Sequence, residues 1–194
     1  MKNEWIDRIL QAEGNAILNT AEKIDAEQID AVIKGIANCK GKIILSGCGT
    51  SAAAAKKISH TLNCVGCPSL FMEPSDAVHG GLGVVEEEDV VILVSKGGET
   101  KEINELLPAI KEKNTIIAVT ENPVSMIAKK SSILLQMPVV EEPDPFHMLA
   151  TSSIMAVIAV FDAICINIME QKAYSKKEFA RIHPGGAVGK KLQG

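Results

Sequence analysis

Short apolar runs alternate along this chain with longer segments in which apolar residues recur at helical spacing. The runs predict β-strands, and the longer segments predict helices between them. Strands are expected at 42–46, 69–72, 89–94, 115–119 and 132–136. Helices are expected at 51–63, 99–111, 124–130 and 147–170. This alternation favours an α/β fold with a doubly wound, five-stranded parallel sheet, for which we expect the order 2-1-3-4-5 and a site at the carboxyl edge of the central strands.

The two ends of the chain carry further helical patterns. Apolar residues at helical spacing predict N-terminal helices within 3–40, and a last helix is expected at 176–181. The most apolar stretch, 154–168, is shorter than a membrane span and contains Asp162 and Asn167. We therefore expect a buried helix there and no membrane partner.

Composition describes an ordinary globular protein. The 194 residues suffice for one domain, 1–194, with 46% hydrophobic and 23% charged residues. Aromatic residues make up only 3%, so the core must be aliphatic, which suits a buried parallel sheet. A net charge of −4 argues against a nucleic-acid partner.

The N-terminus and the cysteines indicate a cytoplasmic protein. Met1 to Trp5 is polar and shows no secretory signal, and five cysteines, an odd number, suit a reducing compartment. Cys64 and Cys67 form a CxxC pair without a second pair, which we interpret as inert thiols. No two histidines have metal-ligand spacing, so no metal site is expected.

Two hydroxyl- and glycine-rich loops follow predicted strands directly. They read Ser46-Gly-Cys-Gly-Thr-Ser51 and Ser95-Lys-Gly-Gly-Glu-Thr100. A strand-to-helix turn exposes backbone N–H groups at the positive end of a helix, which favours a phosphate. Neither loop has the glycine pattern of a dinucleotide fingerprint or a Walker loop. The alternative for each serine and threonine is a helix N-cap.

Acidic residues and histidines supply candidate proton-transfer groups. Glu99 lies in the second loop, and Glu142 lies in a proline-rich loop before the last long helix. The alternative for Glu99 is a residue in the first turn of a helix, where the helix dipole favours an acid. The alternative for Glu142 is a solvated glutamate on the surface. His79 and His183 lie in glycine-rich turns, where an imidazole can also cap the backbone.

Four motifs together resemble the sugar isomerase (SIS) domain family. They are the two serine loops, His79-Gly-Gly-Leu-Gly83 and His183-Pro-Gly-Gly-Ala-Val-Gly189. Within that family the chain is most similar to arabinose 5-phosphate isomerases of the Kdo and capsule type, without their CBS domains. The resemblance implies an α/β fold of the flavodoxin-like type, a three-layer α/β/α sandwich with a five-stranded parallel sheet. It also implies aldose–ketose isomerisation of a sugar phosphate through an enediol, no required cofactor, and a homotetramer whose contacts involve the helices of 3–40.

The same resemblance assigns roles to residues. It implies acid–base or ring-handling roles for Glu99, Glu142, His79 and His183, with Glu142 favoured as the base. It implies substrate or phosphate contacts for Ser46, Gly47, Thr50, Ser51, Ser95, Lys96, Gly97, Thr100, Thr151, Ser152 and Ser153.

The chain departs from the family pattern at three positions. Thr50 replaces a lysine, Gly97 replaces a second serine, and Gly81 replaces an aspartate. We expect Lys96 to restore part of the lost phosphate attraction, the alternative being a solvated lysine. Two other functions stay open: a phosphosugar-binding domain without catalysis, and an isomerase of the 3-hexulose 6-phosphate type.

Overall fold

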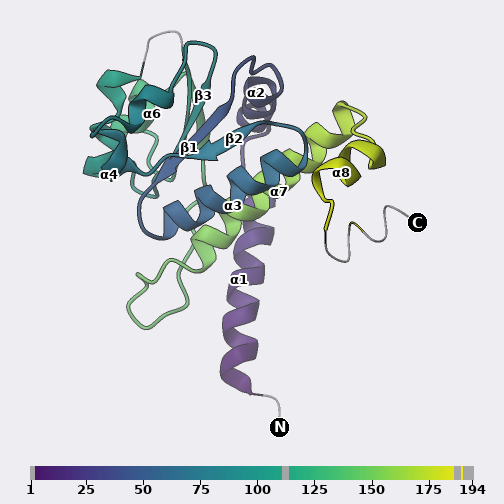
Figure 1. Cartoon of the computed structure of the whole chain (residues 1–194). Helices are drawn as coiled ribbons and strands as arrows, with labels where there is room; N and C mark the ends of the chain where they lie inside the picture. Colours follow the sequence, from purple (N-terminus) through teal and green to yellow (C-terminus); the bar gives the residue numbers. More distant parts are fainter. Residues whose placement is uncertain (1–2, 111–113, 186–188, 190–194) are drawn as a thin grey trace.

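The computed structural model describes residues 3–110, 114–185 and 189. Its centre is a five-stranded parallel sheet of order β2-β1-β3-β4-β5 (Figure 1), as the alternation of apolar runs predicted. The strands are β1 (Ile43–Gly47), β2 (Ser69–Phe71), β3 (Val90–Val94), β4 (Thr115–Thr120) and β5 (Ile133–Gln136).

Helices cover both faces of the sheet, which confirms the predicted three layers. Alternate side chains of β3 enter different cores: Val90 and Ile92 face α2 (Ala26–Ala37), α3 (Thr50–Cys64) and α7 (Ser152–Gln171). Val91 and Leu93 face α4 (Pro74–Ala77), α5 (Lys101–Asn104) and α6 (Met126–Lys130). Both cores are largely aliphatic, as the low aromatic content predicted.

The N-terminal segment forms two helices. α1 (Glu4–Lys23) ends before Asp25, whose carboxylate accepts the N–H groups of Glu27 and Gln28 and so caps α2. α2 packs on β5, and α1 crosses α7. Figure 1 shows that the N-terminal half of α1 projects away from the rest of the molecule.

α7 is the central apolar helix. Its buried side chains include Phe161, Ile164 and Ile168, and it packs against α1 and α3. Within the described ranges, it is the one helix that is long and apolar enough to cross a membrane, and half of its apolar window is buried inside the domain. A core helix accounts for this composition.

Two predicted helices are shorter in the structure. The segment 99–111 was expected to be one helix, yet it contains α5 and a separate 3-10 turn, η2 (Leu107–Ala109). Pro108 explains the break, because its ring displaces the backbone of the preceding turn and it has no N–H. The helix expected at 147–170 begins at Ser152, since Asp144 and Glu142 bind backbone N–H groups of the residues before it.

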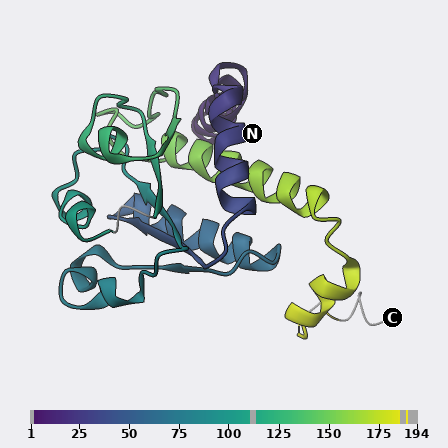
Figure 2. The same cartoon turned by 90° about the horizontal axis from the view of Figure 1, so that it is seen from above.

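The last described helix, α8 (Lys176–Ile182), begins with a capping box between Ser175 and Glu178. Figure 2 shows α8 beyond the C-terminal end of α7, beside no strand of the sheet. A second short turn, η1 (Gly81–Val84), follows α4. Of the His183 motif, residues 186–188 lie outside the described residues.

Candidate active site

The loop after β1 brings α3 close to the sheet. A Cβ on Gly47 would lie 3.0 Å from the backbone of Ser51, and Gly49 has φ +56°, so both glycines permit the tight turn. Ser46 is fully buried, and its hydroxyl donates to the carbonyl of Met72 at 2.8 Å. Ser46 therefore ties β1 to the segment after β2, whereas Thr50 is exposed and Ser51 lines a pocket.

The loop after β3 is held together by its own hydroxyls. Ser95 Oγ accepts the N–H of Gly98 at 3.1 Å and lies 2.7 Å from Thr100 Oγ1. Gly98 has φ +68°, and a Cβ there would overlap Ser125. These contacts fix the loop so that Lys96 and Gly97 are exposed beside the carboxyl end of β4.

Glu142 is a buried anion at the N-terminus of α7. Its side chain is 1% exposed, and Oε2 accepts the N–H groups of Thr151 at 2.9 Å and Ser152 at 2.8 Å. Oε1 accepts the Ser153 hydroxyl and the Lys96 ammonium, the latter at 3.0 Å. The carboxylate thereby caps the helix at its positive end.

Two opposing effects act on the pKa of Glu142. Burial raises it, but the hydrogen bonds from Ser153, Thr151 and Lys96 outweigh burial and bring the pKa below its ordinary value. Glu142 is therefore ionised at neutral pH. Glu142 is thus a buried, hydrogen-bonded carboxylate at the start of α7, not a solvated glutamate on the surface.

Lys96 connects Glu142 to a second carboxylate that the sequence analysis missed. Lys96 Nζ lies 3.8 Å from Oε1 of Glu121, the first residue after β4. Glu121 is 15% exposed, and burial raises its pKa more than Lys96 lowers it. Its position offered a signal, because a charged residue directly after a buried strand lies at the edge where ligands bind.

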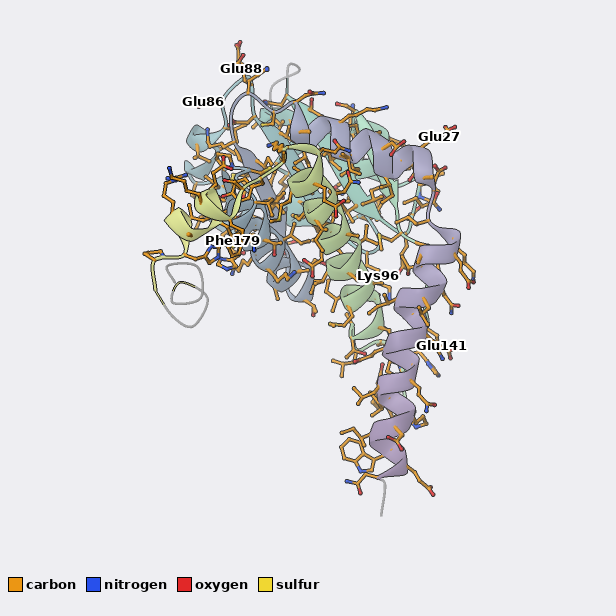
Figure 3. The ribbon with its side chains drawn as sticks, turned by 90° about the vertical axis from the view of Figure 1, so that its right-hand side faces the viewer. Glu27, Glu86, Glu88, Lys96, Glu141 and Phe179 are labelled. Atoms are coloured by element: carbon orange, nitrogen blue, oxygen red, sulfur yellow. The ribbon has the colours of Figure 1, made fainter. Side chains whose placement is uncertain are left out.

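Lys96 and Glu121 border a pocket at the carboxyl ends of β3, β4 and β5. Its volume is about 40 Å³, and its polar lining comes from Ser51, Lys96, Thr120, Glu121 and Ser153. Figure 3 shows Lys96 on the side from which α1 projects, far from Glu86 and Glu88. Both hydroxyl-rich loops and the start of α7 therefore meet at one edge of the sheet.

The hydroxyl run that opens α7 is only partly bonded. Ser153 donates to Glu142, whereas Thr151 Oγ1 and Ser152 Oγ are buried without a hydrogen-bond partner among the described residues. Unpaired buried hydroxyls are costly, so they are candidates for ligand contact.

Glu99 and His79 lie on the surface. The Glu99 carboxylate accepts the N–H of Met126, the first residue of α6, at 2.9 Å. Glu99 precedes α5, so it is not the first-turn residue of its own helix that was weighed as the alternative. His79 is exposed in the turn between α4 and η1. Neither side chain borders the pocket beside Lys96.

His183 lies at the other end of α3 from the two loops. Its Nε2 is 3.5 Å from the thiol of Cys64, the last residue of α3, and its ring stacks on Phe179 at 4.0 Å. Within one chain the structure therefore does not bring His183 together with Glu142. Cys64 and Cys67 are free thiols, and no metal-binding cluster of three ligands occurs in the ranges that the structure describes.

The parallel sheet, its order and the loops at its carboxyl edge define an α/β domain of the kind that binds a ligand at a topological switch point. The SIS domain model matches residues 35–167. The chain belongs to the SIS domain family.

Relatives of known structure extend over nearly the whole chain. A Listeria monocytogenes protein designated a candidate sugar-phosphate isomerase is 49% identical, with a TM-score of 0.91, over 95% of this chain and 99% of that one. An Escherichia coli CFT073 protein solved in complex with arabinose 5-phosphate is 32% identical, with a TM-score of 0.90, over 95% of this chain and 100% of that one.

A curated relative is longer than this chain. The arabinose 5-phosphate isomerase KpsF of Escherichia coli is 38% identical over 188 residues, which are 96% of this chain and 59% of KpsF. The chain therefore spans about 59% of the length of this relative.

Proposed function

We propose that this protein is a phosphosugar isomerase that interconverts an aldose phosphate and a ketose phosphate through an enediol. The observation that carries the proposal is the pairing of Lys96 with two carboxylates, Glu142 and Glu121, beside both hydroxyl-rich loops. The reaction moves a proton between adjacent carbons, which needs a carboxylate or imidazole near those carbons and a clamp on the phosphate.

We propose arabinose 5-phosphate and ribulose 5-phosphate as the substrate pair. KpsF carries that activity in its name, and the related Escherichia coli CFT073 structure holds arabinose 5-phosphate. In this chain the phosphate would lie against the loops after β1 and β3. The contacting residues would be Gly47, Thr50, Ser51, Ser95, Lys96, Gly97, Thr100, Thr151, Ser152 and Ser153. Ser46, whose buried hydroxyl donates to Met72, would support the first loop from within.

Lys96 has competing partners in this arrangement. Because Nζ faces two carboxylates, the charge around it is net negative, and a phosphate would have to compete with Glu142 and Glu121 for it. A contribution of Lys96 to phosphate affinity is tested by Lys96→Ala. A charge-assisted hydrogen bond predicts a loss of about 10- to 100-fold in affinity.

Glu99, Glu142, His79 and His183 remain candidates for proton transfer and ring handling. Because His183 lies far from the loops of its own chain, a role for it requires a neighbouring subunit. We propose a homotetramer in the cytoplasm, in which at least one histidine completes the site of a neighbour.

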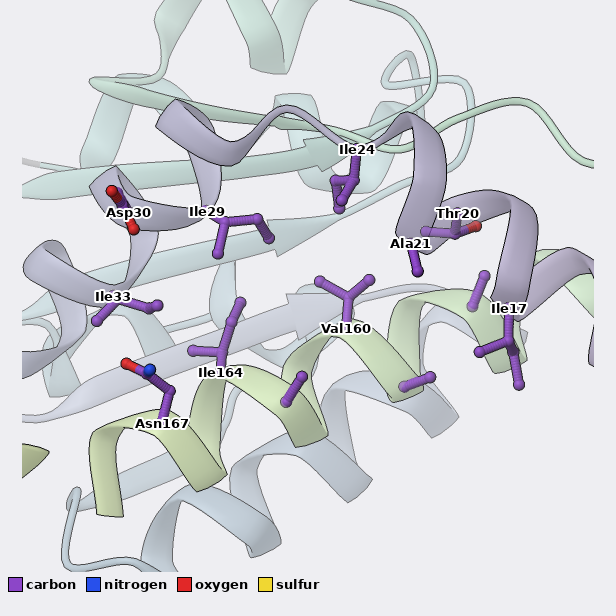
Figure 4. Close-up of a pocket in the computed structure, with 13 residues that line it drawn as sticks. Ile17, Thr20, Ala21, Ile24, Ile29, Asp30, Ile33, Val160, Ile164 and Asn167 are labelled. Carbon is purple, nitrogen blue, oxygen red and sulfur yellow. The ribbon is translucent and has the colours of Figure 1, made fainter. Parts of the chain in front are cut away.

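An apolar surface supports the proposed assembly. Figure 4 shows Ile17, Ile24, Val160 and Ile164 around a groove of about 510 Å³ between α1, α2 and α7. The projecting part of α1 also exposes apolar side chains. Light scattering of the wild type and of Leu10→Asp tests this: the variant should give a smaller particle, and an active monomeric wild type would contradict the proposal.

The experiment for the function is a panel of pentose, hexose and heptose phosphates assayed for aldose–ketose exchange in D₂O. Isomerisation of arabinose 5-phosphate with deuterium uptake at the carbon next to the carbonyl supports the proposal. Binding without deuterium uptake would indicate a sensor domain. Turnover confined to a hexulose phosphate would assign another substrate.

A further inference from the structure

Glu121 occupies a distinctive place beside the two loops. It is the first residue after β4, so the sheet fixes its backbone, and its N–H donates to the carbonyl of Lys96 at 2.9 Å. The side chain is 15% exposed and borders the pocket with Ser51 and Ser153. The sheet thus fixes the backbone of a carboxylate residue at the point where the phosphate loops and α7 meet.

The two carboxylates that face Lys96 differ in how firmly they are held. Both oxygens of Glu142 are engaged: one accepts two backbone N–H groups, and the other accepts Ser153 and Lys96. Approaching a sugar carbon would require Glu142 to release the start of α7. The Glu121 carboxylate has one polar contact within the described residues, the 3.8 Å ion pair with Lys96, which is longer than a hydrogen bond.

The two carboxylates also differ in pKa: the loosely held Glu121 has the raised value, and the firmly held Glu142 has the lowered one. Burial raises the pKa of Glu121, Lys96 lowers it, and the charge of Glu142 raises it further, with a net rise. Hydrogen bonds bring the pKa of Glu142 below its ordinary value. Carboxylates pushed apart in this way divide the work between a permanent anion and a group that exchanges protons. A carboxylate with a raised pKa is also the stronger base.

We propose that Glu121 is the catalytic carboxylate that transfers the proton between adjacent carbons of the sugar phosphate, while Glu142 is a positioning residue that holds Lys96 and the start of α7. This inference rests on the proposed isomerase function. It replaces Glu142, which the sequence analysis favoured as the base.

The transfer balances without any further reactant. The Glu121 carboxylate removes the proton from the carbon beside the aldehyde, and the C–H electron pair forms the double bond of the enediol as the carbonyl π pair moves onto oxygen. The proton of the neighbouring hydroxyl passes to that oxygen. Glu121 then returns its proton to the former aldehyde carbon, which leaves a ketone at the adjacent carbon.

Glu121→Gln tests this role with arabinose 5-phosphate as the probe. The side chain keeps its size and loses its basicity, so we expect kcat to fall by about 10²–10⁴-fold. The dissociation constant measured by calorimetry should rise by less than about threefold, because no phosphate donor is removed and one competitor for Lys96 is lost. Glu105→Gln is the matched control, since it removes an exposed ion pair of nearly equal length, 3.7 Å to Lys101, away from the pocket.

Chemical rescue separates proton transfer from a structural role. Formate added to Glu121→Ala should restore part of the turnover, whereas it should not change the turnover of Glu105→Gln. A positioning role would show no such rescue.

The outcomes distinguish this inference from the proposed function. If the wild type incorporates deuterium into none of the sugar phosphates of the panel, the proposed isomerase function is overturned. An active wild type together with a Glu121→Gln variant within tenfold of its kcat would overturn the role of Glu121 alone. An inactive Glu121→Ala that formate does not rescue would also overturn it.

Discussion

Lys42 and Lys96 lie at opposite edges of the same sheet, and each faces two carboxylates. Lys42 precedes β1, and its Nζ lies 2.8 Å from Asp89 and 3.0 Å from Glu86. Lys96 follows β3 and lies 3.0 Å from Glu142 and 3.8 Å from Glu121. Figure 3 shows that Glu86 and Lys96 are far apart.

The two groups differ in where their second carboxylate lies. At the amino edge, Asp89 is fully buried and bound by two backbone N–H groups, while Glu86 is 77% exposed to water. At the carboxyl edge, Glu142 is equally well bound, but Glu121 is shielded from water, loosely paired and open to a pocket. One lysine with two carboxylates is therefore a structural clamp at one edge and a candidate site at the other.

Asp89→Ala should produce the largest loss of stability. It removes the buried partner of Lys42, which keeps only the exposed Glu86, and it removes the acceptor for the N–H groups of Lys42 and Glu86. Breaking a buried pair by removing one partner costs about 3–5 kcal/mol. Urea unfolding followed by circular dichroism measures it. The control Glu86→Gln should cost less than about 1 kcal/mol, because its carboxylate is exposed.

Glu142→Gln should have the next largest effect. The amide oxygen can replace one carboxylate oxygen, but the amide N–H₂ then faces donors at the start of α7. Loss of hydrogen bonds to a charged group predicts a destabilisation of about 1.5–3 kcal/mol. Glu99→Gln is the control, since that exposed carboxylate caps only the short α6. Equal urea midpoints for the two variants would show that Glu142 does not stabilise α7.

The framework on which both edges are built could be predicted from the sequence. The strands and the layers follow from the apolar runs at β1, β3 and β4, because such runs must be buried on both faces of the sheet. The strand order was expected together with the family resemblance, and the structure confirms it. The start of α7 could not be predicted, since it depends on Glu142 reaching across the loop.

The difference between the two carboxylates that face Lys96 is visible only in the three-dimensional structure. The sequence shows that Glu142 precedes a helix, but it does not show that both oxygens are occupied. Glu121 belongs to none of the family motifs, and the pocket that it borders is completed by distant residues that include Ala150 and Ile154. The role proposed for His183 would require a neighbouring chain, which a single sequence does not specify.

A pH series should separate the tightly bound carboxylates from the others. Asp89 and Glu142 have pKa values lowered by folding, so the unfolded chain binds protons first as the pH falls. Their contribution is complete above the unfolded values of about 4 and is lost as the pH falls through the folded values. The urea midpoint should therefore fall between about pH 5 and pH 3. Asp89→Asn and Glu142→Gln should each give a shallower slope, and parallel slopes would contradict the assignment.

Glu121→Gln should have the smallest effect on stability, and its sign should be opposite. Folding raises the pKa of Glu121, because burial disfavours its charge more than Lys96 stabilises it and the charge of Glu142 adds a smaller rise. A raised carboxyl pKa means that the folded chain binds protons more tightly, so this group's contribution becomes less favourable as the pH rises above the unfolded value. Removing the charge should therefore raise the urea midpoint at pH 7, by less than about 1 kcal/mol in free energy of unfolding. Below about pH 4 the wild type and the variant should converge, because the wild-type carboxyl is then protonated. A midpoint that falls at pH 7 would show that the pairing with Lys96 outweighs burial, and Glu121 would then resemble Asp89 at the opposite edge.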